Sequence, residues 1–406
     1  MQSPADREFE ALTDPAFCPI LAELAAQPTI SLSMLDTLRR QFGRDTAEAI
    51  LRLANSRRKA VGKFIHAEKL WLDPVRVEQA THHMVAEHKA KRFQGLAVAD
   101  ICCGLGGDSF ALARQAKGVA SVDLDRDALR RLEFNADVYG YRSQILPVQG
   151  DANHGLFDRS IAVHIDPDRR AADHIGRPRF SLDDCQPSLQ TLLSYMTAHN
   201  GGAIKLSPGS DFESLEKRAV LLGVRTESEI ISLSGECREA TIWFGQLAGK
   251  SPRRATILPG QFEFAGQPGG SIRKTAEPKP GDWLFELDPA VVRSGLAANF
   301  AAANQLHALT PDGAWLFTDH IHQNISGMVQ KFQVMDSASV DRRAVRQMLR
   351  NLGWSSAVVK TRGRIHAAEI QKWLEKQPSG QATETLIVIT VPGLPSRAIA
   401  AKRLQM

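Results

Sequence analysis

The sequence predicts an α/β fold in which a mostly parallel sheet is closed by an antiparallel hairpin. Between residues 96 and 206, short apolar runs alternate with amphipathic stretches, which is typical of strands joined by crossover helices. Two further strand-like runs then follow one another across the polar segment Ser234–Glu239, which indicates a hairpin. We expect a helical region before this core and a basic α/β region after it.

The first 93 residues are expected to be helical. The stretch 33–55 places its apolar residues at helical spacing between polar positions. Asp73-Pro74 then predicts the start of a further helix that runs toward Phe93, because Asp caps helices and Pro is tolerated in the first turn. No strand pattern occurs in this region.

The core and the tail follow in order along the chain. The polar break at 249–254 predicts a boundary, so we expect three parts: residues 1–93, 94–249 and 250–406. The predicted core strands are 97–102, 118–122, 144–148, 161–165 and 203–206, with helices at 109–116, 127–139 and 187–199 and hairpin strands at 229–233 and 240–245. The tail is expected to hold a Gly/Pro-rich loop at 266–281, strands at 256–258, 332–335, 357–359 and 385–391, and helices at 340–352 and 367–375.

The composition is that of a soluble globular protein with two or three domains. The chain has 406 residues, of which 43% are hydrophobic and 23% charged. No stretch approaches the roughly 18 apolar residues that a membrane helix needs, and the first residues lack a secretory signal. Five cysteines without Cys-x-x-Cys spacing favour reduced thiols in the cytoplasm. We therefore expect no membrane segment and no metal site.

Positive charge is concentrated in the last part of the chain. Residues 251–406 hold 19 Lys and Arg against 12 Asp and Glu, in a chain with a net charge of +5. Most of the excess follows Ser339, and the stretch Arg52–Arg92 is also basic. Such segregation suits a polyanion, because each neutralised phosphate releases counterions. An ordinary solvated surface has the same pattern, so charge alone is only an indication.

A glycine-rich turn follows the first core strand. The strand carries Asp100, the turn reads Gly104-Leu105-Gly106-Gly107, and a helix begins at Asp108 or Ser109. Glycines at such a turn let the backbone approach a ligand, and the helix N-terminus offers free N–H groups. A glycine turn by itself also occurs simply as a tight corner.

Acids at the ends of the next strands strengthen the prediction of a nucleotide site. Asp123 follows the second strand, where an acid can accept both ribose hydroxyls, and Asp151 follows the third, where an acid can accept the adenine amine. Asp166 follows the fourth. The dinucleotide pattern Gly-x-Gly-x-x-Gly is absent, and an acid beside the turn suits an ammonium and a sulfonium better than a pyrophosphate. The pattern favours S-adenosylmethionine over NAD.

These residues resemble class I S-adenosylmethionine-dependent methyltransferases with a Rossmann-like core, over about residues 95–245. Within that fold the chain looks most similar to bacterial methyltransferases with a C-terminal THUMP-like domain, which in turn resemble trimethylguanosine synthases. Residues that carry the resemblance are ADICCGLGGD (99–108), VDLD (122–125), NADVYG (135–140), GDA (150–152), DPDRR (166–170), GECREATIWFG (235–245) and LFELDPAVVRSGL (284–296), with Trp71 and Glu78-Gln79-Ala80-Thr81 upstream.

The resemblance implies a set of cofactor contacts. The residues expected around the methionine part of S-adenosylmethionine are Asp100, Cys103, Gly104, Gly106 and Gly107. The residues expected around its adenosine are Asp123, Leu124, Asp151 and Ala152. Cys102 and Cys103 are expected to pack in the core rather than to act as nucleophiles, since free Cys is among the most buried residue types.

The resemblance also implies an acceptor site at Asp166-Pro167, where the acid and a backbone carbonyl accept hydrogen bonds from a substrate amine. The sequence departs from the family pattern after this pair, because Asp168, Arg169 and Arg170 replace a second proline and a stacking aromatic. Arg169 and Arg170 would grip a substrate phosphate, or instead pair with a neighbouring acid and shape the loop.

A basic loop is expected in the tail, where Lys360, Arg362 and Arg364 would contact phosphate. Together these features predict a cytoplasmic methyltransferase that acts on a nitrogen of structured RNA. Two other hypotheses stay open: an RNA-binding protein with a methyltransferase-like core and no turnover, and a methyltransferase for protein or a small molecule.

Overall fold

The computed structural model describes residues 3–404 except 28, 155–156, 170–184, 271–276, 321–324, 326, 377, 379–381, 392 and 394. The chain forms two compact units: Met1–Glu227 with Ala240–Gly249, and Ser228–Glu239 with Lys250–Met406. The expected division at residues 93/94 and 249/250 stays a proposal. Within the described residues, no helix has the length and apolar character that crossing a membrane requires.

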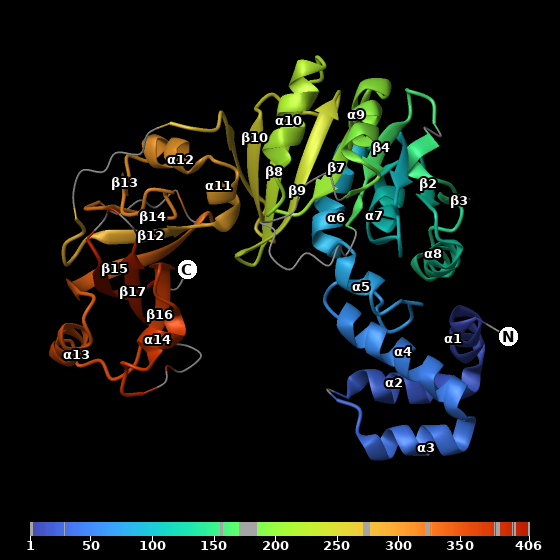
Figure 1. The fold of residues 1–406 in the computed structure, drawn as a ribbon, viewed down its shortest axis with the longest axis horizontal. Helices are drawn as coiled ribbons and strands as arrows, with labels where there is room; N and C mark the ends of the chain where they lie inside the picture. The colour runs from blue at the N-terminus through green and yellow to red at the C-terminus, as the bar shows by residue number, and fades with distance from the viewer. Residues whose placement is uncertain are drawn as a thin grey trace. The chain divides into compact units, whose positions relative to one another are not determined.

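The N-terminal region is helical, and its helices differ in extent from those expected (Figure 1). The stretch 33–55 forms two helices, because Gly43 takes a φ of +79° between them. The stretch after Asp73 forms two short helices that are interrupted around Ala80–His82. The helices are α1 (Pro4–Thr13), α2 (Cys18–Ala26), α3 (Leu32–Phe42), α4 (Arg44–Ala60), α5 (Arg76–Gln79) and α6 (His83–Ala90).

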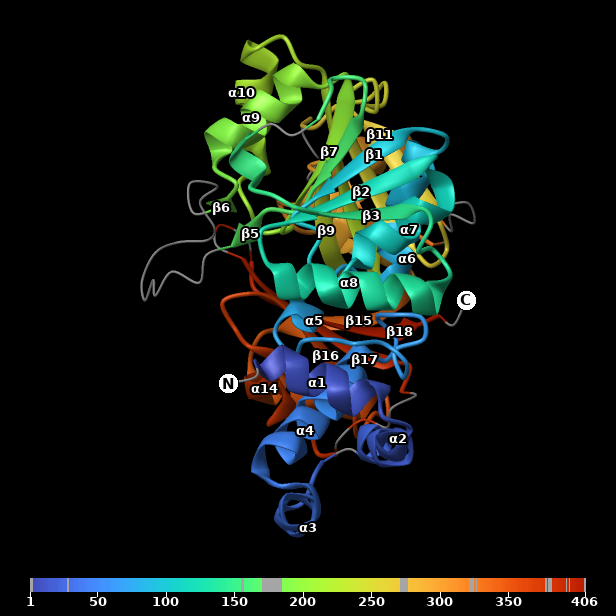
Figure 2. The ribbon, with the colours of Figure 1, turned by 90° about the vertical axis from the view of Figure 1, so that its right-hand side faces the viewer.

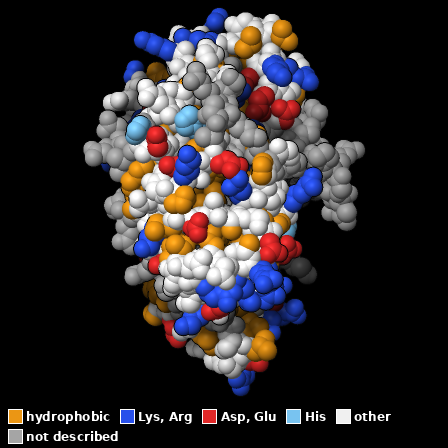
Figure 3. Space-filling model, turned by 90° about the vertical axis from the view of Figure 1, so that its left-hand side faces the viewer, with side chains coloured by type: hydrophobic (Ala, Val, Ile, Leu, Met, Phe, Trp, Pro, Cys, Tyr) orange, Lys and Arg blue, Asp and Glu red, His pale blue; other side chains and the backbone are white. Residues whose placement is uncertain are grey.

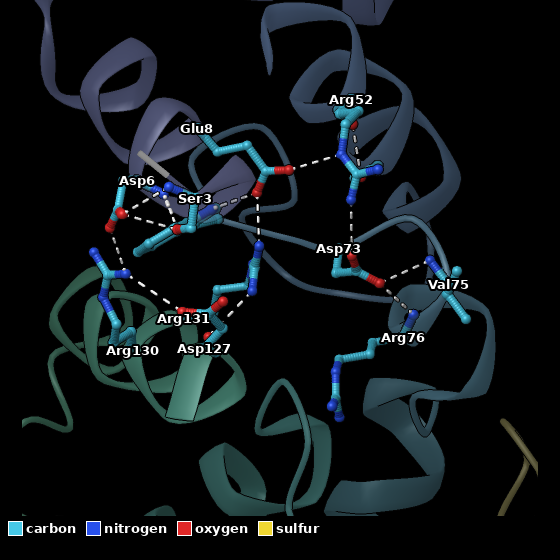
Figure 4. Close-up of polar contacts among 12 residues, drawn as sticks. Ser3, Asp6, Glu8, Arg52, Asp73, Val75, Arg76, Asp127, Arg130 and Arg131 are labelled. Carbon is cyan, nitrogen blue, oxygen red and sulfur yellow. Dashed lines mark hydrogen bonds and ion pairs between the residues drawn. The ribbon is translucent and has the colours of Figure 1, made fainter. Parts of the chain in front are cut away.

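A buried carboxylate joins this helical region to the core. Glu8 on α1 is 1% exposed and accepts hydrogen bonds from Arg131 Nη2 at 2.7 Å, Arg52 Nε at 2.8 Å and Trp71 Nε1 at 3.1 Å. Figure 4 shows Glu8 between the two arginines. Asn135, on the same core helix as Arg131, exchanges two hydrogen bonds with the backbone of Trp71. These contacts fix the helices against the core.

The core is a mixed sheet with the strand order β11-β10-β8-β9-β7-β4-β1-β2-β3. Strands β3, β2, β1, β4 and β7 run parallel, and β9 is antiparallel to β7. This arrangement agrees with the expected parallel sheet and antiparallel hairpin. The strands are β1 (Ala97–Ile101), β2 (Gly118–Asp123), β3 (Ile145–Gln149), β4 (Ala162–Ile165), β7 (Gly201–Leu206), β8 (Thr226–Leu233), β9 (Glu236–Gly245), β10 (Arg253–Leu258) and β11 (Phe262–Gly266).

The hairpin turn is tighter than its sequence suggested. Only Ser234 and Gly235 separate β8 from β9, and their φ angles are 53° and 83°. Two successive positive φ angles match the right-handed twist of the flanking strands, so the strands extend through residues expected to be loop. The segment 236–239 is therefore strand, which corrects the prediction of a six-residue polar loop.

Helices cover both faces of the core sheet (Figure 2). Two of them, α7 (Gly107–Gln115) and α8 (Arg126–Tyr139), lie on one face, and α9 (Leu189–Ala198) and α10 (Phe212–Leu221) lie on the other. Each crossover between parallel strands is right-handed. The chain runs from β1 to β3 in one direction along the sheet and from β4 to β7 in the other, so the two sets of helices lie on opposite faces. All parallel strands therefore present their carboxyl ends at one edge.

The second unit contains a seven-stranded sheet with the order β13-β14-β12-β15-β18-β17-β16. Strand β17 is buried on both faces: Leu386 and Val388 pack with helix residues, and Ile387 and Ile389 pack on the opposite side. The strands are β12 (Trp283–Leu287), β13 (His307–Ala308), β14 (Trp315–Thr318), β15 (Val329–Ser339), β16 (Val358–Gly363), β17 (Glu384–Thr390) and β18 (Arg397–Arg403), and the helices are α11 (Pro289–Arg293), α12 (Ala297–Ala303), α13 (Arg342–Asn351) and α14 (Ala367–Gln371).

The stretch predicted as a basic loop is mostly strand. Residues 358–363 form β16, which pairs in parallel with β17, so Lys360 and Arg362 lie within a strand and only Arg364 follows it. Both cations are alternate residues of one strand and therefore point to the same face of the sheet.

Candidate active site

The turn after β1 is built from residues with positive φ. Cys102, Gly104 and Gly106 have φ angles of 61°, 53° and 86°, and Gly106 directly precedes α7. A Cβ on Gly106 would lie 2.7 Å from the Phe110 ring, so both backbone conformation and space require glycine there. Gly107 packs instead against the backbone of Thr81, 3.3 Å from where its Cβ would be.

Asp123 lies at the end of β2 beside this turn. Its Oδ2 accepts a hydrogen bond from the N–H of Gly104 at 2.9 Å, and its Oδ1 accepts one from the N–H of Asp125, also at 2.9 Å. The next side chain, Leu124, is 70% exposed. A fixed carboxylate beside an uncovered apolar side chain is an arrangement that suits a ribose next to a base.

Asp151 and Ala152 follow β3. The Oδ1 of Asp151 accepts hydrogen bonds from the backbone N–H and side-chain amide of Asn153, and the backbone contact lowers the pKa of this carboxyl. The carbonyl of Ala152 accepts a hydrogen bond from the Tyr195 hydroxyl at 2.7 Å. These contacts fix the segment at the edge where Asp123 also lies.

Asp166 lies next to the glycine turn. Its N–H donates to the carbonyl of Ile101 at 3.0 Å, at the point where β4 and β1 end side by side. The carboxylate is 32% exposed, and Lys205 on β7 donates to it at 2.6 Å. Burial raises the pKa of Asp166, and the opposing charge of Lys205 limits that rise. Sequence reasoning did not find Lys205, because only the parallel pairing of β4 and β7 brings it here.

Asp100 does not lie in the open part of the site. Its side chain is 1% exposed, Ser109 donates to Oδ2 at 2.5 Å, and His164 Nδ1 lies 2.8 Å from Oδ1. Both carboxylate oxygens are therefore taken by core partners. In this structure Asp100 contacts Ser109 and His164 behind the turn, and its contact with the cofactor stays a prediction. The four residues 98–101 of its strand, β1, are buried.

A buried polar network continues from Asp100. His164 lies with Nε2 at 3.1 Å from the Lys89 ammonium, and Lys89 lies 2.8 Å from Asp108 Oδ1. Thr81 also donates to Asp108, at 2.5 Å. Burial would raise the pKa of Asp108, but the charge of Lys89 and that of the nearby imidazole hold it below its usual range. The network joins α6 to the first turn of α7, directly behind the glycines.

The two cysteines of the turn are protonated at neutral pH. Burial raises the pKa of Cys102, and the carboxylates of Asp123 and Asp166 raise it further. Cys103 is buried, and burial raises its pKa together with the carboxylates of Asp100 and Asp123. A thiol without thiolate character is a poor nucleophile. Cys103 is buried, whereas Cys102 is only partly buried.

Several predicted substrate contacts have partners within the protein. Lys360 donates to Glu286 at 2.6 Å, and Arg362 pairs with Asp312. The backbone of Arg169 forms strand β5 (Asp168–Arg169), which pairs with β6 (Cys185–Gln186). The side chain of Arg169 and the whole of Arg170 lie outside the described residues.

An arginine that sequence reasoning did not single out faces the turn. Arg76, the first residue of α5, donates from Nη2 to Asp125 Oδ2 at 2.6 Å. Its Nη1 lies 3.9 Å from where a Cβ on Gly104 would be. Apart from Gly104 and its two neighbours in the chain, no other atom of the described residues lies within 4 Å of that position. The turn is therefore open on this side except for a guanidinium.

A glycine turn with acids at neighbouring strand ends, on this sheet order, defines a nucleotide-binding α/β protein. Residues 96–185 match the family model described as RNA cap guanine-N2 methyltransferase. Over 335 residues, 80% of this chain and 88% of the relative, the sequence is 33% identical to the uncharacterized S-adenosylmethionine-dependent methyltransferase Rv3037c of Mycobacterium tuberculosis H37Rv. The counterpart from strain CDC 1551 matches equally. The chain therefore belongs to the S-adenosylmethionine-dependent methyltransferases.

The fold has a relative of known structure along nearly its whole length. A crystal structure from Porphyromonas gingivalis W83, described as that of a methyltransferase, has a TM-score of 0.76 with 16% sequence identity and covers 98% of this chain and 99% of its own. This likeness concerns the fold.

The residues present fit S-adenosylmethionine, the cofactor of the family. The open side of Gly104, the fixed carboxylate of Asp123 and the uncovered Leu124 lie along one edge and suit, in turn, the methionine part, the ribose and the adenine. Bound there, the cofactor supplies a methyl group on a cationic sulfur. The individual contacts stay predictions.

Proposed function

We propose that this protein transfers a methyl group from S-adenosylmethionine to a nitrogen atom of RNA. The observation that carries the proposal is the position of Asp166: a partly exposed carboxylate, held by Lys205, at the strand end next to the glycine turn. The match of residues 96–185 to an RNA methyltransferase family supports RNA as the substrate class.

In this proposal Asp166 orients the acceptor. Its carboxylate accepts a hydrogen bond from the substrate N–H, which directs the nitrogen lone pair toward the methyl group. A C–N bond forms as the S–C bond breaks, and the nitrogen then loses a proton to water. The ion pair with Lys205 holds the carboxylate in place and favours its ionised, accepting form.

A basic helix face supports RNA docking. Arg343, Arg346 and Arg350 lie on one side of α13, opposite its buried Val345 and Leu349. Within the described residues, none of these guanidinium groups pairs with a carboxylate, and Arg346 and Arg350 donate to backbone carbonyls. Figure 3 shows one group of Lys and Arg side chains in the lower part of the face drawn, with acidic and other basic side chains scattered over the rest.

This pattern changes the proposed docking residues. Lys360 and Arg362 are neutralised by Glu286 and Asp312, so we place phosphate contacts on the α13 face and on Arg364. Arg169 and Arg170 stay candidates for a substrate phosphate. We also keep the proposals that the C-terminal region is THUMP-like and that the protein works in the cytoplasm with reduced cysteines.

Methyl transfer onto RNA tests the proposed function. Purified protein with S-adenosylmethionine labelled in the methyl group should label the RNA in a cell extract. Ribonuclease should then release the label. Asp166→Asn should bind cofactor normally and transfer no label. Asp158→Asn changes an exposed acid before the opposite end of β4 and should transfer normally.

The other outcomes separate the alternatives. Label in protein or small molecules, with none in RNA, would overturn RNA as the substrate. RNA binding without any transfer would favour an RNA-binding protein without turnover. An Asp166→Asn variant that kept its rate would remove Asp166 from the acceptor site.

A further inference from the structure

Arg76 has the geometry of a ligand-binding residue. Its guanidinium contacts Asp125 through Nη2, and its Nη1 points over the glycine turn beside Gly104. Its side chain is 30% exposed, so the group is partly desolvated and still reachable. A planar guanidinium with one edge paired and the other facing an open turn can accept a second anion.

The position of Arg76 is set by a chain of polar contacts. Its backbone N–H donates to Asp73 Oδ1 at 3.0 Å, and Arg52 donates to the other oxygen of Asp73 at 3.2 Å. Arg52 in turn donates to the buried Glu8 at 2.8 Å. Figure 4 shows this succession from Glu8 to Arg76. The start of α5 is thus anchored before any ligand binds, which keeps the cost of ordering Arg76 low.

The carboxylate of the cofactor requires a cationic partner near the glycine turn. The amino-acid end of S-adenosylmethionine carries a carboxylate as well as an ammonium. The acids at this edge, Asp123 and Asp166, suit the ammonium and hydroxyl groups and repel the carboxylate. Of the nearby cations, Lys205 is held by Asp166, and Lys89 lies in the buried network behind the turn.

We propose that Arg76 binds the carboxylate of the cofactor's methionine part, so that the N-terminal helical region completes the cofactor site. The inference rests on the cofactor of the family and not on the RNA substrate. Arg76 lies on the stretch before the core, outside the matched residues 96–185.

Calorimetry with two ligands tests this role. S-Adenosylhomocysteine carries the carboxylate, whereas 5′-methylthioadenosine has the same adenosine and sulfur without the amino-acid end. Arg76→Gln should weaken S-adenosylhomocysteine binding roughly 10- to 100-fold, as expected for a lost hydrogen-bonded charge pair, and leave methylthioadenosine binding unchanged. Arg130→Gln removes another arginine of the same region, which pairs with Asp6 and Asp127, and should change neither affinity.

Asp125→Asn separates direct binding from an indirect effect. If Arg76 binds the carboxylate, removal of the competing acid should leave S-adenosylhomocysteine binding unchanged or tighter. If Arg76 only holds Asp125, this variant should weaken binding as Arg76→Gln does, and the proposal would be wrong. Equal losses for both ligands in Arg76→Gln, or no loss at all, would also overturn it. Failure of the wild-type protein to bind either ligand would instead contradict the cofactor assignment itself.

Discussion

The ammonium of Lys89 lies 2.8 Å from the carboxylate of Asp108, and both side chains are buried. Lys89 belongs to α6, ahead of the first core strand, while Asp108 lies in the first turn of α7. The pair therefore ties the helical region to the residues immediately after the glycine turn. A buried pair of this kind is costly to break on one side, because the remaining charge has no water to solvate it.

Loss of Lys89 should destabilise the fold. We expect Lys89→Met to lower the free energy of unfolding by about 3–5 kcal/mol, as for other buried pairs cut on one side. Urea denaturation followed by circular dichroism would measure it. The double variant Lys89→Met/Asp108→Leu removes both charges and should regain much of the loss; a double variant as unstable as the single one would contradict this explanation.

The same pair predicts a dependence on acid. The folded pKa of Asp108 is lowered from the ordinary 3.8, so its contribution to stability is complete above that value and is lost as pH falls below it. In Lys89→Met the opposing charge is gone, and this part of the acid dependence should shrink. Unfolding midpoints from about pH 2 to 6 for both proteins would show it, because this range covers the loss below 3.8, and parallel curves would contradict it.

A comparison of alanine substitutions at two glycines distinguishes the cost of backbone strain from the cost of side-chain crowding. Gly106→Ala and Gly140→Ala both force a positive φ, 86° and 74°, which costs roughly 1 kcal/mol for a non-glycine residue. Only at Gly106 does a Cβ meet the Phe110 ring and Leu132, whereas nothing lies within 4 Å at Gly140. Gly106→Ala should therefore be the more destabilising by thermal unfolding, and equal losses would mean that the ring moves aside freely.

Asp123 should contribute directly to cofactor affinity. Asp123→Ala is expected to weaken S-adenosylmethionine binding by about 1.5–3 kcal/mol, the range for hydrogen bonds to a charged group. Asp137→Ala removes an exposed acid of α8 and is the matched control. Calorimetry on both folded variants gives the comparison. Unchanged affinity in Asp123→Ala would remove this residue from the cofactor site.

Lys205 should determine the pH at which the methyl-transfer rate rises on the acid side of its pH profile. Burial raises the pKa of Asp166 and Lys205 lowers it, so Lys205→Met should raise that pKa further. If the ionised carboxylate accepts the substrate hydrogen bond, the rising limb of the rate against pH moves to higher pH. Lys217→Met, an exposed lysine on α10, should leave the profile in place. A loss of rate without any shift would give Lys205 another role.

Much of the core was predictable because its information is local. The runs that became β1 to β4, and the glycines between β1 and α7, are adjacent in the chain, and alternation with helices implies the parallel order. The tight turn at Ser234-Gly235 was not recognised, because the polar residues of β9 resemble loop. In the same way, the polar stretch around Lys360 and Arg362 predicted a loop, whereas the structure pairs both residues with β17.

The site was only partly predictable, because its electrostatics depend on residues far apart in sequence. Asp123 and Asp166 lie where strand ends were expected. Lys205 is 39 residues from Asp166, which it contacts. Arg76 is 49 residues from its hydrogen-bond partner Asp125, which lies two residues after Asp123. Asp100 is buried beside His164, which is 64 residues away in the sequence, so its surroundings could not be predicted from the residues next to it.

Because Glu8 and Lys89 contact the core, we expect that the cofactor motifs do not fold without the helices that precede them. A fragment that began at residue 94 would leave Arg131 and Asp108 without the charges that compensate them and would uncover the apolar surface that α6 covers. The glycine turn could not be grafted to another scaffold without the helices that precede it. The helices before residue 94 and the cofactor motifs belong to one compact unit.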